Sequence, residues 1–135
     1  MAPTTYAAFV DGLEALTVSG VTRVFQGPPA ALNTADLPAM WCQAPRGEEG
    51  AMTFLPGTGG WPSLVVDLLI ATEPVGQSIQ ASNFALQVQL LDALATALRG
   101  ADIGKAPLSW SIRAVQITVA GNAYWGVSAT VTGRG

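Results

Sequence analysis

The chain has 135 residues, a formal net charge of −3, and only 11% charged residues. This length fits one domain, so we expect a single domain spanning residues 1–135. The six basic residues are scattered along the chain, which excludes a surface that grips nucleic acid, because such surfaces need clustered Lys and Arg. Ordinary soluble domains carry about 25% charged residues. The low fraction of charged residues favours a polar surface that neighbouring subunits cover, because uncharged groups are more easily desolvated. A merely neutral domain is the alternative.

The first third of the chain predicts one helix and two strands. Apolar residues at helical spacing predict a short first helix near the amino end, and residues 21–25 alternate as a strand does. Two successive prolines, Pro28 and Pro29, cannot donate hydrogen bonds to a strand ladder. Residues 26–36 are therefore predicted as a loop, followed by a second strand at residues 37–44.

Residues 45–60 form the least regular stretch, with several Gly and Pro around a small apolar island. A long connection inside a compact domain is usually functional. We therefore expect an extended loop at about residues 45–60 that is held by a partner. The candidate contact residues here are Met52, Phe54, Leu55 and Trp61.

A strand and the main helix follow the loop. Residues 64–72 are an almost continuous apolar run, which is typical of a central strand. Residues 78–99 predict a helix that is charged only at Asp92 and Arg99. Its breadth of apolar positions indicates a helix covered on more than one side. The main apolar stripe is predicted at Phe84, Val88, Leu91, Ala95 and Leu98. It is broadened by Leu86, Leu90, Ala93, Leu94 and Ala97.

The last third predicts a hairpin, with strands at residues 108–119 and 123–132 joined at Gly121 and Asn122. The expected register places Val119 opposite Tyr124. Apolar residues near the turn break the polar pattern of one face, so we expect the hairpin end to present Val119 and Tyr124 to a partner.

The order of these elements predicts an α+β fold. We expect a mixed or antiparallel sheet of about five strands, with two helices packed on one face and a closing β-hairpin. The long uncharged stretches contain glutamines or alternate polar with apolar residues, so no membrane helix is expected.

The residue types that carry chemistry are scarce. The chain has no His, which removes the most frequent general base and metal ligand. Cys42 is a single thiol without an activating neighbour in the sequence, so a buried apolar role is expected for it. We therefore predict that the protein is not an enzyme and has no catalytic residues, no cofactor and no metal site. Four Trp leave a small carbohydrate-binding module as an alternative of a different class.

Three stretches resemble the tail terminator proteins of long-tailed bacteriophages, the lambda-type neck subunits. They are GVTRVFQGPPAALNTADLPAMW (residues 20–41), EPVGQSIQASNFALQVQLLDALATAL (residues 73–98) and YWGVSATVTGRG (residues 124–135). Together they span most of the chain. Other phage neck and tail-completion subunits share this architecture and are the nearest alternative.

The resemblance implies a homo-hexameric ring in the tail neck of a virion, assembled in the host cytoplasm. Such a ring ends tail-tube polymerisation and joins the tail to the head-completion or stopper proteins, so the implied partners are copies of the chain, the tail tube protein and the stopper. DNA only passes through the lumen, which a slightly acidic wall would suit. The candidate acidic lumen residues are Asp36, Glu48, Glu49 and Glu73.

Overall fold

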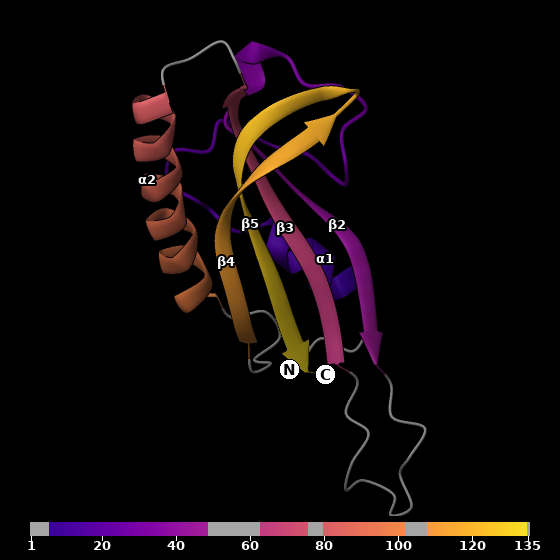
Figure 1. Ribbon diagram of the computed structural model, residues 1–135. Coiled ribbons are helices and arrows are strands. Elements are labelled where there is room, and N and C mark those ends of the chain that lie inside the picture. The colour runs from indigo at the N-terminus through magenta and orange to yellow at the C-terminus, as the bar shows by residue number, and fades with distance from the viewer. Residues whose placement is uncertain (1–5, 49–62, 76–79, 102–107, 135) are drawn as a thin grey trace, which may run out of the picture.

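The computed structural model describes residues 6–48, 63–75, 80–101 and 108–134 (Figure 1). In chain order its elements are the helix α1 (Tyr6–Glu14), the strand β1 (Arg23–Val24), the 3-10 helix η1 (Thr34–Asp36), the strands β2 (Ala39–Glu48) and β3 (Ser63–Pro74), the helix α2 (Gln80–Arg99), and the strands β4 (Leu108–Val119) and β5 (Asn122–Arg134).

The five strands form one open sheet in the order β1-β2-β3-β5-β4. β1 pairs with β2 in parallel, whereas the other three pairings are antiparallel. The sheet is therefore mixed, and the predicted α+β fold of about five strands and two helices is confirmed.

The boundary of the predicted loop at residues 45–60 is wrong at its first end, because β2 continues to Glu48. The strand passes through Pro45 by means of a bulge. Its register against β3 shifts between Gln43 and Arg46, and Ala44 has a φ of 51°. A bulge is one of the few places where a strand tolerates a residue that lacks an amide N–H.

The hairpin is confirmed, but its turn lies one residue earlier than predicted. Val119 pairs with Asn122, so the two turn residues are Ala120 and Gly121, with φ of 53° and 80°. Positive φ at both positions is the geometry that matches the twist of two-residue hairpins. The predicted register, with Val119 opposite Tyr124, was therefore wrong by two residues, and each side chain keeps its predicted face because the error is even.

Both helices pack on the same face of the sheet, as predicted, and bury one continuous core there. Figure 1 shows α2 beside β4, and α1 behind β2 and β3. We call this group the helix-side core. Its fully buried members are Phe9, Leu13, Met40, Leu64, Val66, Leu68, Ile70, Leu90, Leu94, Leu98, Val127, Ala129 and Val131, with Val18 and Cys42 nearly so.

A second, smaller cluster lies on the opposite face. The end of the β4–β5 hairpin curves across the upper part of the sheet (Figure 1), and residues from the segment before β2 pack there as well. We call this group the far-side cluster. Its buried members are Ala39, Trp41, Leu69, Ala71, Ile117, Val119 and Tyr124, and Phe25, Leu32, Leu37 and Val115 pack against them.

The curve of the hairpin coincides with a bulge in the pairing of β3 with β5. The register shifts between Ala71 and Glu73, which leaves Thr72 as an extra residue, and its Oγ1 donates to the carbonyl of Trp125 at 2.9 Å. Gly126 lies beside this bulge, where a Cβ would come within 2.4 Å of the Ile70 carbonyl oxygen. Only glycine therefore permits this close approach of β5 to β3.

Candidate subunit interface

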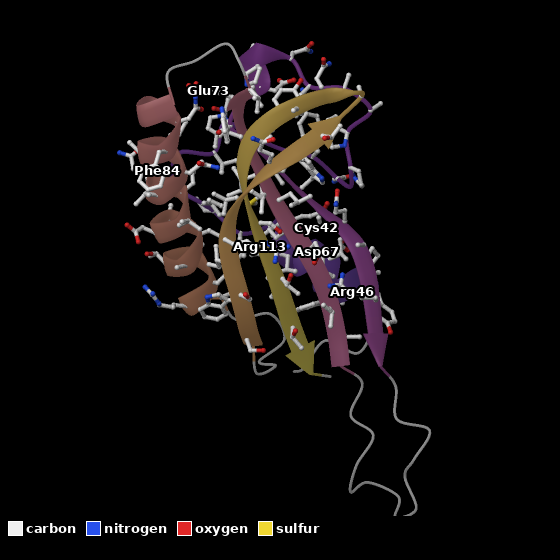
Figure 2. The ribbon with its side chains drawn as sticks, in the orientation of Figure 1. Cys42, Arg46, Asp67, Glu73, Phe84 and Arg113 are labelled. Atoms are coloured by element: carbon white, nitrogen blue, oxygen red, sulfur yellow. The ribbon has the colours of Figure 1, made fainter. Side chains whose placement is uncertain are left out.

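The outer flank of α2 carries the largest exposed apolar side chains in the described part of the chain. Phe84 is 66% exposed and Val88, one turn later, is 40% exposed. Figure 2 shows Phe84 projecting from α2 away from the strands. Leu91 and Ala95 continue the same flank and are half-buried. An apolar stripe on an outer helix flank marks a surface suited to contact with another protein.

The predicted apolar stripe of this helix is therefore wrong at Phe84 and Val88, whereas Leu98 and the broadening residues Leu90 and Leu94 are buried. The arc that faces the sheet begins with two buried amides, Asn83 and Gln87, and only then continues with Leu90, Leu94 and Leu98. Gln87 is buried because its Nε2 donates to the carbonyls of Gly126, at 2.8 Å, and Val115, at 3.3 Å. Buried carbonyls need such donors, so a polar residue faces inward and Phe84 is left outside.

The hydrogen bonds of Gln87 also fix the height of α2 against the sheet. Val115 pairs with Gly126, which pairs with Ala71 on β3. The same row continues through β2 and ends on β1: its last members are Ala39 and Arg23. The exposed residues around Gln87 therefore lie level with β1, at the opposite side of the sheet.

That opposite side contains the third exposed apolar residue and an acidic hollow. Val24 on β1 is 38% exposed. It borders an open hollow of about 420 Å³ between β1 and the end of α1. The lining residues are Asp11, Glu14, Ala15, Val24 and Gln26. Glu14 accepts a hydrogen bond from the Gly27 amide at 2.9 Å, which fixes its carboxylate beside the hollow.

The lower part of the far face is polar and is not covered by any described segment. Arg46 contacts Asp67 at 3.2 Å, and the same Asp67 oxygen accepts a hydrogen bond from Thr130 at 3.3 Å. Arg113 lies on this face opposite Ser128 in the ladder, and β5 separates its strand β4 from the strand β3 of Asp67 (Figure 2). Partly exposed pairs of this kind contribute little to stability.

The expectation that the hairpin end presents Val119 and Tyr124 to a partner is corrected by the structure. Val119 is 8% exposed and Tyr124 is 5% exposed, because both pack in the far-side cluster. The sequence did indicate an apolar patch near this turn. The segment that covers it belongs to the same chain.

The remaining predicted contact residues, Met52, Phe54, Leu55 and Trp61, lie outside the described residues, as does Glu49. Glu48 is the last residue of β2. Asp36, in η1, forms an ion pair with Arg23 at 3.2 Å. Glu73 is half-buried near the end of β3, at the upper end of the sheet in Figure 2, so the two acids are on different segments.

The chemistry open to Cys42 is limited by its position. The side chain is buried in the helix-side core. Burial raises the pKa of the Cys42 thiol to about 12, and the negative charge of Glu14 adds to the shift. Thiolate is the reactive form, so the side chain is inert near neutral pH. Within the described residues, no three His, Cys, Asp or Glu gather as metal ligands would, and neither helix is both long and apolar enough to span a bilayer.

The tryptophans of the described residues are also placed. Trp41 is buried in the far-side cluster, where its Nε1 donates to the Gln43 Oε1 at 3.0 Å. Trp110 packs against the helix-side core and Trp125 is half-buried. The surface that the geometry singles out is therefore the α2 flank with Phe84 and Val88.

No protein-family model matches the sequence, and no curated protein matches it either.

Proposed function

We propose that this protein is a structural subunit that associates with copies of itself into a ring, as the resemblance to phage tail terminators implies. The observation that carries the proposal is the exposed apolar flank of α2, where Phe84 and Val88 face solvent. Burying such residues against a protein partner stabilises a complex. The low charge of the chain supports the same proposal, because few charged groups would have to be desolvated.

In this proposal the ring ends polymerisation of the tail tube and joins it to the stopper protein of the head. The protein then acts by surface complementarity and uses no catalytic residue. The buried, inert Cys42 agrees with that role.

The mass of the purified protein in solution tests the proposal. Light scattering during size-exclusion chromatography is expected to give a discrete multiple of the 13.9 kDa chain, and electron micrographs are expected to show closed rings. The substitution Phe84→Ser is expected to shift the mass towards one chain. Gln89→Ser, on an exposed position of the same helix, is the matched control and is expected to leave the multiple intact.

A wild-type protein that stays at the mass of one chain at all accessible concentrations would contradict the proposal. Circular dichroism of the Phe84→Ser variant separates a lost contact from a lost fold, because an exposed side chain can be removed with little effect on folding.

A further inference from the structure

The large exposed apolar residues of the described chain lie in two places that match in height. Phe84 and Val88 flank Gln87 on α2, and Val24 follows Arg23 on β1. Gln87 is hydrogen-bonded to Val115 on β4, and the row of paired residues that begins at Val115 crosses all five strands and ends at Arg23. The two sites are therefore level with each other at opposite edges of the sheet.

The two sites also lie in the same layer. α2 covers the β4 side of the sheet, and α1 covers β2 and β3 on the same face (Figure 1). The hollow beside Val24 is bounded by Asp11, Glu14 and Ala15 of the α1 end. A helix placed against this hollow would extend the helix layer by one more member.

The charges of the two sites differ. The hollow is lined by two carboxylates, Asp11 and Glu14, and by no cation. On α2 the exposed charged residues are Asp92 and Arg99, and Arg99 forms no ion pair within the described residues. Opposite charges on two surfaces favour their encounter and fix their orientation.

We propose that the flank of α2 in one copy packs against the acidic hollow of a second copy, with Phe84 and Val88 seated on Val24. The contact joins two different surfaces of the same chain, so it is heterologous, and repeated rotation closes it into a ring. This inference rests on the proposed function, and it names the two surfaces that meet.

Cysteine cross-linking tests the pairing. The single variants Val24→Cys and Phe84→Cys are purified separately, mixed, allowed to exchange subunits and treated with a short bis-maleimide. The native Cys42 can stay, because it is buried. We expect at least tenfold more cross-linked dimer in this mixture than in either variant alone, and at least tenfold more than in a mixture of Val24→Cys with the control Gln89→Cys.

Two outcomes overturn the inference while the proposed function survives. One is a wild-type oligomer whose mixed variants cross-link no better than the Gln89→Cys control. The other is efficient cross-linking of Phe84→Cys with itself, which indicates a two-fold contact between α2 helices. A wild-type protein that is monomeric overturns the proposed function and this inference together.

Discussion

The two faces of the sheet are covered in different ways. On one face, α1 and α2 bury a continuous, mainly aliphatic core against Leu64 to Ile70 of β3 and Val127 to Val131 of β5. On the other face, the hairpin end and the segment before β2 cover only the upper part, with aromatic residues such as Trp41 and Tyr124. The lower part keeps polar residues, among them Arg46 and Asp67.

This difference follows a change of pattern within single strands. The lower half of β4 alternates Ser109 and Ser111 outward with Trp110 and Ile112 towards the helices. Beyond Arg113 the outward positions become apolar, and that is where the chain folds back over itself. The covered face of the strand therefore changes along its length: Trp110 and Ile112 pack on the helix side, whereas Ile117 and Val119 are buried on the far side and Gln116 and Thr118 are exposed. The alternation keeps its period of two, and the apolar residues move to the other face where the surroundings change.

Truncation of one residue in each cluster gives the sharpest contrast. Leu94→Ala is expected to lower the free energy of unfolding by about 3 kcal/mol, because the fully buried helix-side core cannot close the cavity. Ile117→Ala is expected to cost about 2 kcal/mol, since the hairpin end can shift and water can reach the gap. Denaturant titration measures both. Thr118→Ala, on the exposed side of the same strand, is the control; equal losses from the two core variants would contradict two clusters of different rigidity.

Gly126→Ala probes the position where β5 passes from the helix-side core to the far-side cluster. The added methyl would meet the Ile70 carbonyl oxygen at 2.4 Å and Ile117 Cδ1 at 2.5 Å. We expect a loss of about 2 kcal/mol from such overpacking. Amide exchange is expected to lose protection first at the hairpin end.

The double variant Gly126→Ala with Ile117→Val separates the two contacts, because valine lacks the Cδ1 atom. The contact with the Ile70 carbonyl remains, so only part of the loss should be recovered. Full recovery would show that the backbone of β3 accepts the methyl without strain.

Removal of the ion pair on the uncovered part of the far face is expected to have the smallest effect. Arg46→Ala should cost about 0.5 kcal/mol or less, since both side chains are partly exposed and Asp67 keeps its hydrogen bond from Thr130. Thermal melts at low and high salt measure this, and the difference should vanish at high salt. A loss above 1 kcal/mol would mean that this face is less solvated than the fold indicates.

Much of the fold follows from local patterns in the sequence. The alternation along β4 and β5 predicted both strands and the face of each side chain, and the apolar run of β3 predicted a central strand. The turn was placed one residue late because glycine followed by asparagine fits a two-residue turn, whereas Ala120 adopts a positive φ that alanine rarely takes. The bulge at Ala44 was equally invisible, since nothing in the sequence before Pro45 marks it.

The surface was harder to predict than the fold. Phe84 was assigned to the buried stripe because apolar residues usually face inward. The buried arc instead contains Gln87, whose partners are carbonyls on two distant strands. Sequence-remote segments also decide which apolar patch remains open: the patch at Val119 is covered by residues from before β2, and no local pattern reveals that. Asn83 and Gln87 lie on the same arc of the helix as Leu90 and Leu94. These two amides are the sequence feature that could have indicated polar contacts between this arc and the sheet.

The bulge in β2 also makes the two edges of the sheet unequal as places where a further strand could pair. Below β1, β2 is an edge strand whose register against β3 is irregular, and it includes Pro45, which has no amide hydrogen to offer. β4, at the other side, pairs regularly over its whole length with β5 and contains no proline. A further strand can therefore be added at β4 and not along the bulged part of β2. Strand addition between copies would stop at a pair, which protects a protein of low charge against open-ended fibres.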